Sequence, residues 1–576
     1  MKYRGPTGTG RQSEHRGGGV GYKADLLRSE FCKVKMLRIF CTFRKEYVVG
    51  FLLLLAVTII WIWAFNTNSF AKPDALDYAQ MGRELGNGNG LSTLQIFPRH
   101  IRLFYQKGYL EKENWPNLYR YPLPTILNAF FYKITDDIIK AAVLQSGIAF
   151  LLSIPLLFIL ATRLTNLKVG IISIIFYAAD PVIFTGSYEA MTEPMAALLL
   201  LWLFLIAFSG QLSPWKCFAM GIICGLSCLN RAQFILLVPL AALYIWINLQ
   251  KKKKFAGFVL LLVALLLVVG PWFIRNTVVV GEPAFSFSTS RNLVKGSSPI
   301  HSDLEMQLEA PTETLEVFKK YGPAIAKKAL KNLSTVVRLN FWAGNFSPKG
   351  SIFLFFLFAS FIYRRHSANR KYDYFRNAAA TLIFCNFLVI SLAFLHKMRF
   401  YTPLMPLIYI VGINEIFMFF GNSRFKYSGK LKQVVFYGML LFGMVRLYNA
   451  AMIQKNSHLP VSAQENKSYE LIRQVAAKNT IVASNIPATL ALYVGCRALS
   501  LPAFPIELLK INDNYLPIDY VLITGNVLNA DPSEKPSLAE TYTNYSEFVK
   551  SDEFLKTFKF IKELPDGAML FERLQK

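Results

Sequence analysis

Long apolar runs recur along this chain, and charged or polar segments separate them. The first run, YVVGFLLLLAVTIIWIWAF, covers residues 47–65 without one charged side chain. A helix needs about 20 apolar residues to cross the hydrocarbon core of a bilayer. Hydrophobic residues make up 53% of the sequence, and the mean hydropathy is +0.34. A soluble domain has no use for that much apolar surface, so we predict a polytopic α-helical membrane protein.

Eleven membrane spans are predicted from these runs. They cover residues 47–65, 141–162, 169–187, 194–209, 217–230, 233–249, 255–273, 351–363, 378–395, 402–420 and 433–450. When the spans are counted from a basic cytoplasmic N-terminus, every loop expected inside carries lysine or arginine, such as KKKK at 251–254. This is the positive-inside pattern of membrane proteins. An odd number of spans places the C-terminal segment outside.

Three parts of the chain follow from this count. Residues 1–46 form a basic leader rich in glycine, predicted to be disordered and cytoplasmic. Residues 47–450 form the membrane domain, whose large outer loops, 66–140 and 275–350, are expected to contain amphipathic helices. Residues 451–576 alternate helix-like and strand-like segments, so we predict a small extracytoplasmic α/β domain there.

The net charge and the cysteines exclude two classes of partner. The formal charge is +27, but the basic residues fall in short clusters between apolar runs and not on one face. We therefore expect no nucleic-acid partner. The seven cysteines show neither a CxxC pair nor a Cys/His cluster with zinc spacing, so no metal centre is predicted from them.

Some basic side chains stand at outer span ends, where the positive-inside pattern predicts few. They are Arg231, Arg275, Lys397 and Arg399. Ionisable residues at membrane depth are candidates for function, and a guanidinium can bind two oxygens of one phosphate. These cations would suit a lipid-linked phosphate. The alternative is that each side chain extends to the lipid headgroups, and for Lys397 the two interpretations are equally good.

Carboxylates gather on the same side of the membrane. Asp74, Asp77 and Glu84 follow the first span in AKPDALDYAQMGREL, and Glu193 lies in SYEAMTEPMAALLLLW. A base near fixed cations suits a reaction in which a hydroxyl loses its proton while a phosphate leaves. Judged from these residues alone, capping of a helix start is the favoured alternative for Asp74 and Glu193. Glu84 is predicted to be a solvated residue of the helix face.

Taken together, these segments resemble lipid-dependent glycosyltransferases of the GT-C superfamily, in particular the bacterial group similar to protein O-mannosyltransferases and lipid A aminoarabinose transferases. The resemblance is carried by PDALDYAQMGREL with GNGLS, YRYPLPTIL, YEAMTEPMAALLLLW, GPWFIRNTVVVGEPAFSFSTSRNLVKGSSP, HKMRFYTPLMPLIYI and TIVASNIPATLALYVGCRALSLP. Each motif is weak by itself. Their common order and sidedness, from about residue 47 onward, make the likeness fairly specific.

The resemblance implies a membrane glycosyltransferase that uses a polyprenyl-phosphate sugar. It would move a hexosyl or pentosyl group to an acceptor hydroxyl on the outer side of a bacterial inner membrane. Asp74 matches the catalytic aspartate of the family's first loop and Glu193 its second-loop acid, with Asp77 as the alternative for the first role. The acceptor is left open as a lipid, a glycan or a protein. No cofactor is required, although two acids facing a phosphate could recruit a divalent ion.

In the predicted reaction, Asp74 takes the acceptor proton while the hydroxyl attacks the anomeric carbon, which would invert its configuration. Glu193 would orient the acceptor or a cation. The lipid phosphate of the donor would be bound by Arg275, Lys397, Arg399, Arg231 and Tyr401.

Two other classes of function are weighed against this one. A membrane transporter or lipid flippase would also have many spans and intramembrane charges. Transporters usually show an internal repeat and charges near the midplane, whereas this sequence shows no repeat and its charges gather at one face. A membrane scaffold with a sensory outer domain would not need acids and cations on the same side.

Overall fold

The protein is described by a computed structural model. The model describes residues 45–66, 69–70, 72–295, 304–311, 314–341, 350–362, 369–393, 398–421, 428–457, 463–476, 479–528 and 545–574. The predicted leader, apart from its last two residues, and Lys397 lie outside the described residues. The chain divides into two compact units, Met1–Leu53 and Leu54–Lys576. Every contact described below lies within the second unit.

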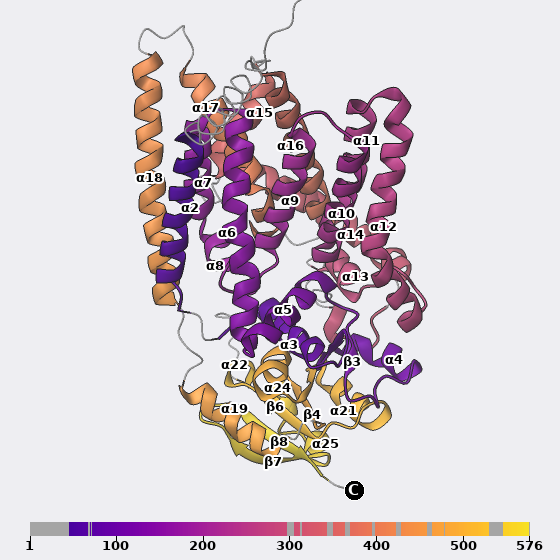
Figure 1. The fold of residues 1–576 in the computed structure, drawn as a ribbon. Helices are drawn as coiled ribbons and strands as arrows, with labels where there is room; N and C mark the ends of the chain where they lie inside the picture. Colours follow the sequence, from indigo (N-terminus) through magenta and orange to yellow (C-terminus); the bar gives the residue numbers. More distant parts are fainter. Residues whose placement is uncertain are drawn as a thin grey trace, which may run out of the picture. The chain divides into compact units, whose positions relative to one another are not determined.

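Apolar helices make up almost half of the described chain (Figure 1). They are α2 (Lys45–Trp63), α6 (Ile138–Leu164), α7 (Leu167–Ala178), α9 (Glu193–Phe208), α10 (Pro214–Asn230), α11 (Leu237–Asn248), α12 (Lys254–Val280), α15 (Gly350–Ile362), α16 (Arg370–Ala393), α17 (Met405–Phe420) and α18 (Ser428–Ser457). Each predicted span overlaps one of them. Within the described ranges, six helices are long and apolar enough to cross a membrane, and four further apolar helices are shorter. The helical membrane fold is confirmed, and eleven crossings stay a prediction.

Polar side chains set where these helices begin. Asp137 precedes α6, and its carboxylate accepts the backbone N–H groups of Ile139 and Lys140. Asn166 precedes α7, and its side-chain oxygen accepts the N–H of Val169. Such N-caps satisfy donors that have no partner inside the helix. They turn a long apolar stretch into separate helices.

A second group of helices is amphipathic (Figure 1). This group consists of α3 (Pro73–Gly86), α4 (Pro98–Gln106), α5 (Pro122–Thr135), α13 (Phe287–Val294) and α14 (Thr314–Phe341). Helix α3 packs closely on α5, where the Asn128 amide donates to the Tyr78 carbonyl over 3.1 Å. Helices are thus present in both segments for which amphipathic helices were predicted, and the outer location of these segments stays a prediction.

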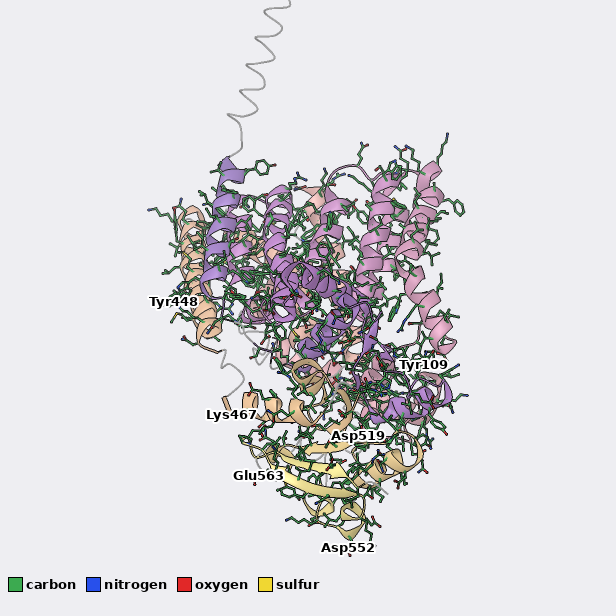
Figure 2. All side chains as sticks on the ribbon, turned by 60° about the horizontal axis from the view of Figure 1, so that its bottom comes forward. Tyr109, Tyr448, Lys467, Asp519, Asp552 and Glu563 are labelled. Carbon is green, nitrogen blue, oxygen red and sulfur yellow. The ribbon has the colours of Figure 1, made fainter. Side chains whose placement is uncertain are left out.

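The C-terminal part forms a small mixed sheet, as predicted. Its strand order is β2-β5-β4-β6-β8-β7, with parallel pairs up to β6 and antiparallel pairs beyond it. The strands are β2 (Gln95–Ile96), β4 (Ile481–Ser484), β5 (Arg497–Ser500), β6 (Tyr520–Ile523), β7 (Phe558–Glu563) and β8 (Met569–Arg573). Helices α19 (Ala463–Val475) and α21 (Pro505–Asn514) flank it. Figure 2 labels Asp519 beside the sheet, where its carboxylate accepts the N–H of Ile481 over 2.9 Å.

Strand β2 was not predicted. It comes from the first outer loop and pairs with β5, with Gln95 opposite Ala498 and Ile96 opposite Leu499. Two residues are too few for an alternating pattern to be recognised in a sequence. The predicted boundary at residue 451 falls inside α18, and a separate domain beginning there stays a prediction.

The core beside the sheet joins three distant parts of the sequence. Phe104 and Phe287 come from the two predicted outer loops, and Leu499 and Val521 come from the sheet; all four side chains are buried in one cluster. Burying a phenylalanine side chain contributes about 1.5–3 kcal/mol to folding. This shared core holds the loops against the sheet and thereby fixes α13, which carries Arg291.

Close helix contact depends on glycine at the crossing of α15 and α17. A Cβ added to Gly412 would lie within 2.6 Å of the Phe353 Cα and 2.8 Å of its carbonyl oxygen. These are backbone atoms, so relief requires the two helices to move apart. We expect Gly412→Ala to cost about 1–3 kcal/mol of stability, measured as a lower thermal midpoint of the full chain in detergent.

Gly438→Ala is the matched control, because an added Cβ at Gly438 in α18 meets nothing within 4 Å. There the substitution should be neutral or slightly stabilising, since alanine favours a helix by about 0.5–1 kcal/mol. Equal midpoints for the two variants would contradict the proposed packing.

Candidate active site

Asp74 lies in the first turn of α3, after the N1 proline. The N-cap residue is Lys72, and no side chain caps the helix. The carboxylate of Asp74 instead binds two guanidinium groups: its Oδ1 lies 2.7 Å from Nη2 of Arg120, and its Oδ2 lies 2.5 Å from Nη2 of Arg399. The capping interpretation of Asp74 is therefore wrong, because the side chain turns toward the cations.

Asp77 lies one helical turn farther and binds the same arginine. Its Oδ2 accepts from Nε of Arg120 over 2.9 Å and from Nη2 over 2.7 Å. The guanidinium carbon of Arg120 also lies 4.6 Å from the ring centre of Tyr119 and 5.5 Å from that of Tyr78. One partly buried guanidinium thus joins both acids of the predicted first outer loop.

The pKa values of the two carboxyl groups are shifted in opposite directions. Burial alone would raise both pKa values, but Arg120 and Arg399 together hold the pKa of Asp74 well below its usual range. For Asp77 burial dominates over the attraction of Arg120, and its pKa is raised. The side chain of Asp77 is 5% exposed against 23% for Asp74, so it loses more hydration. The lowered pKa keeps Asp74 ionised at neutral pH.

Glu193 and Arg231 form a second ion pair. Glu193 begins α9, and its Oε1 lies 2.8 Å from Nη1 of Arg231, which follows α10. The same Nη1 donates to the hydroxyl of Thr192 over 2.8 Å. Glu193 is only 2% exposed. Its position at a helix start agrees with the sequence prediction, and the carboxylate holds Arg231 in place.

Two cavities meet at Asp74. The first has a volume of about 110 Å³ and includes Arg231 and Asn230 in its lining. The second has a volume of about 550 Å³ and reaches the sheet at Ser500 of β5. The side chains that line both are Asp74, Tyr119, Arg120, Arg291 and Arg399. Asp74 is the one carboxylate of this shared set, so it can contact molecules in either cavity.

Two of these shared residues, Arg120 and Arg291, were missed in the sequence. Nε of Arg291 lies 2.9 Å from Oε2 of Glu305, which is fully buried, and its Nη1 donates to the hydroxyl of Tyr119. Arg120 stands inside the quoted YRYPLP motif, two residues before the proline that starts α5. Arg291 stands inside the quoted run GPWFIRNTVVVGEPAFSFSTSRNLVKGSSP. An arginine within a quoted motif was the available signal for both residues.

Other predicted site residues lie elsewhere. Arg275 donates to the carbonyl oxygens of Asn117 over 2.7 Å and Leu91 over 3.1 Å, and it lines neither cavity. Tyr401 is fully buried with its ring 5.1 Å from that of Phe387, and it also lines neither cavity. The structure therefore brings Asp74, Asp77, Arg231, Arg399 and Glu193 together but leaves Arg275 and Tyr401 outside the site.

The prediction for Glu84 is wrong. Its side chain is 3% exposed, not solvated, and its oxygens bind Nε of Arg83 at 3.3 Å and the Asn89 amide at 2.7 Å. It lines neither cavity. In the described part of the chain, no group of three or more His, Cys, Asp or Glu side chains could hold a metal ion.

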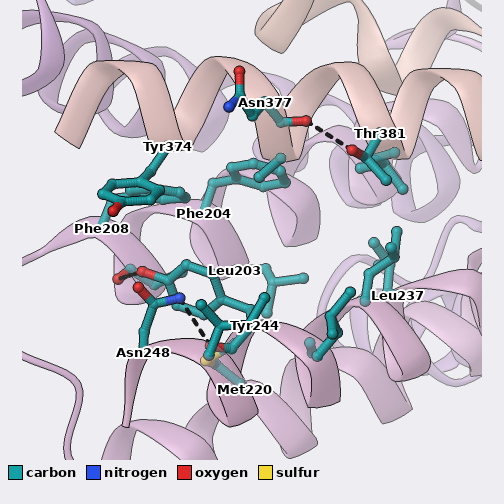
Figure 3. Close-up of a pocket in the computed structure, with 17 residues that line it drawn as sticks. Leu203, Phe204, Phe208, Met220, Leu237, Tyr244, Asn248, Tyr374, Asn377 and Thr381 are labelled. Carbon is teal, nitrogen blue, oxygen red and sulfur yellow. Dashed lines mark hydrogen bonds between the residues drawn. The ribbon is translucent and has the colours of Figure 1, made fainter. Parts of the chain in front are cut away.

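A third cavity is apolar and separate from the first two. Figure 3 shows it between α9, α10, α11 and α16, with Phe204, Tyr244 and Tyr374 in its lining. Its volume is about 250 Å³, and it shares no lining residue with the other two.

Arg120 should be essential for stability as well as for the site. Arg120→Leu leaves Asp77 buried without a cation, and breaking a buried pair in this way costs about 3–5 kcal/mol. Without Arg120, the pKa of Asp77 in the folded protein would rise further above its value in the unfolded chain. The free energy of unfolding then falls as the pH rises from the unfolded-state pKa to the folded-state pKa, and the full loss is present above both. Unfolding of the full chain in detergent should therefore show a larger loss at neutral than at mildly acidic pH.

The double variant Asp77→Asn with Arg120→Leu is the matched control. It removes the buried charge, so it should be more stable than Arg120→Leu alone. A loss that does not depend on pH, or a double variant that is no more stable, would contradict the role of Arg120 as partner of Asp77.

Comparison with known proteins agrees with this geometry. Residues 120–274, which begin at Arg120 and include Glu193 and Arg231, match the model of the dolichyl-phosphate-mannose-protein mannosyltransferase family. No curated protein sequence matches the chain. The structure of ArnT from Cupriavidus metallidurans bound to undecaprenyl phosphate is similar, with a TM-score of 0.52 and 11% identity, over 92% of this chain and 99% of that one.

A second similar structure is archaeal. The oligosaccharyltransferase AglB from Archaeoglobus fulgidus, in complex with an inhibitory peptide and a dolichol-phosphate, has a TM-score of 0.53 and 11% identity, over 93% of this chain and 75% of that one. At such low identity these matches show a common fold. Residues 120–274 are thus similar to the dolichyl-phosphate-mannose-protein mannosyltransferase family, and the chain as a whole has the fold shared by ArnT and archaeal oligosaccharyltransferase.

Proposed function

We propose that this chain is a membrane glycosyltransferase of a bacterial inner membrane. It transfers a hexosyl or pentosyl group from a polyprenyl-phosphate donor to an acceptor hydroxyl on the extracytoplasmic side. The observation that carries the proposal is the position of Asp74, the carboxylate between two cavities and between Arg120 and Arg399. The family match and the lipid phosphates named with ArnT and AglB support a polyprenyl-phosphate donor.

The smaller cavity suits the donor phosphate. Arg231 lies at the end of α10, and Arg399 follows the predicted ninth span, so both stand where apolar helices end. A lipid phosphate held there would leave its tail among the helices. The side-chain oxygen of Asn230 is buried in the lining without a hydrogen-bond partner in the described part of the chain. It is available for a sugar hydroxyl.

The proposed step is a single displacement. Asp74 removes the proton from the acceptor hydroxyl while that oxygen forms a bond to the anomeric carbon. The bond from the anomeric carbon to the phosphate oxygen breaks, and polyprenyl phosphate leaves with the electron pair. Arg399 and Arg231 offset the charge that grows on this phosphate. Attack opposite the leaving group inverts the anomeric configuration.

Donor binding should also activate the base. In the donor-free protein, Arg399 binds Asp74 and helps to keep the pKa of that carboxylate low, so Asp74 is a weak base. A phosphate in the smaller cavity would compete for the same guanidinium. As Arg399 turns to the phosphate, the pKa of Asp74 rises toward its ordinary value and its basicity increases. The base is thus strengthened when a donor is present.

Glu193 acts as a positioning residue in this scheme. Its carboxylate is buried against Arg231 and lines neither cavity. By holding that guanidinium at the cavity wall, it lowers the cost of ordering the cation for the phosphate. Transport or lipid flipping is less well supported, because the ion pairs lie at helix ends under packed loops and not along a central passage.

Asp74→Asn should abolish transfer. Loss of a general base costs about 10²- to 10⁴-fold in rate, whereas binding of undecaprenyl phosphate should remain. The assay follows labelled sugar from a panel of undecaprenyl-phosphate hexoses and pentoses to acceptor in native membranes. Glu84→Gln is the control, because Glu84 is a buried acid of the same helix outside both cavities.

Two outcomes would contradict this assignment. Transfer by Asp74→Asn at a rate near that of the wild type would exclude Asp74 as the base. Loss of transfer in Asp77→Asn, with Asp74→Asn still active, would assign the role to Asp77.

Arg399→Gln should change both carrier binding and the pH profile. Losing one charged hydrogen-bond partner should raise the Kd for undecaprenyl phosphate about tenfold. Because Asp74 then keeps only Arg120, its pKa rises, so the acid limb of kcat/KM should move to higher pH. Arg275→Lys is the control, since Arg275 contacts loop carbonyls instead of the cavities. An unchanged acid limb with unchanged binding would contradict both roles of Arg399.

A further inference from the structure

The larger cavity extends from Asp74 away from the donor arginine Arg231 and toward the C-terminal sheet. Asn485, Thr489 and Ser500 belong to the sheet region and line it, whereas Asn230 and Arg231 line only the smaller cavity. A molecule in the larger cavity would therefore reach Asp74 without entering the space beside Asn230 and Arg231. An acceptor hydroxyl and a donor phosphate need separate spaces of this kind around the base.

Gln95 is the side chain in this lining whose polar group indicates that a ligand binds here. It lies on β2, where pairing with β5 fixes its backbone opposite Ala498. The side chain is 6% exposed, and its Oε1 is buried without a hydrogen-bond partner among the described residues. Leaving such a group unsatisfied is energetically unfavourable. A bound molecule that donates a hydrogen bond would remove this cost.

The rest of the lining has the chemistry of a sugar site. Phe97 and Tyr119 supply flat rings for the C–H face of a sugar, and Thr489 and Ser500 supply hydroxyl groups. Arg120 adds a donor beside them. A serine or threonine side chain would need only a narrow slot, whereas about 550 Å³ has room for whole rings.

We infer that the larger cavity binds the acceptor, that the acceptor is a glycan or glycolipid head group, and that Gln95 selects it through a hydrogen bond to one of its hydroxyls. This inference rests on the proposed function of Asp74. A site built to hydrogen-bond a hydroxyl rejects molecules that lack it more strongly than an apolar pocket can. The sheet and the strand added to it would thus determine the acceptor, and the arginines would determine the donor.

The test compares Gln95→Leu with wild type in the full chain. Purified protein is mixed with the labelled donor and with membranes from source cells that lack the protein, and the label is traced to lipid, glycan or protein. When the membranes that supply the acceptor are limiting, Gln95→Leu should transfer the label about tenfold more slowly than wild type. When these membranes are saturating, the transfer rates of the two proteins should become equal. Inhibition by undecaprenyl phosphate should not change, because Gln95 does not line the donor cavity.

Two further variants distinguish a loss of acceptor binding from a folding defect. Ser92→Ala is the matched control, because Ser92 also has a buried oxygen without a partner in the described ranges but lines neither cavity. It should behave as wild type. Thr489→Val changes a half-buried hydroxyl of the lining. It should show the same dependence on acceptor concentration even if Gln95→Leu is unstable.

Each outcome has one meaning. Label in lipid or glycan, with the expected loss in Gln95→Leu or Thr489→Val, supports the inference. Label in protein overturns the acceptor class, and wild-type behaviour of both variants overturns the site. If wild-type protein transfers no label from any donor, the proposed function itself fails, whatever Gln95 does.

Discussion

The guanidinium of Arg120 binds two carboxylates one helical turn apart, and the arrangement around it depends on that contact. The side chain of Asp77 is almost fully buried, and its burial without this cation would be energetically costly. With Arg120 in place, Asp77 anchors the arginine, and the arginine in turn directs Asp74 toward the cavities. Aromatic rings of Tyr78 and Tyr119 lie beside the guanidinium and restrict its orientation. A structural acid and a reactive one can therefore share a single partner.

Much of this arrangement could be predicted from the sequence, for identifiable reasons. Apolar runs and charged loops locate helices and their ends, because burial in a bilayer imposes a strict length and polarity. Asp74, Glu193, Arg231 and Arg399 stood out as charges where such a pattern predicts few, and they do meet. Arg275 stood out for the same reason, yet its guanidinium supports loop carbonyls. A charged residue at a position where the pattern predicts few charges needs an interaction partner, and backbone carbonyl groups can be that partner.

What the sequence did not reveal is contact between distant segments. Arg120 and Arg291 lie in outer loops where positive charge has no unusual neighbour, and only folding brings them to Asp74. Gln95 is an ordinary polar residue until β2 pairs with β5 and buries it. Glu84 was misjudged because a polar residue on an amphipathic helix usually faces water, whereas a nearby arginine and asparagine cover this one. Local patterns predict elements, and their partners depend on tertiary packing.

Strand β2 also has a consequence for how the protein is made. The edge of the C-terminal sheet comes from a segment that leaves the ribosome before most of the membrane helices, while its partner β5 is among the last parts synthesised. Pairing of ends so far apart in sequence is slow, because loop closure must precede it. Until β5 arrives, β2 has no sheet to join. A chain truncated before the sheet would lack this partner, whereas an isolated C-terminal fragment would expose the bare edge of β5 and be prone to aggregate. Biogenesis of the acceptor side would therefore be complete only when the whole polypeptide is present.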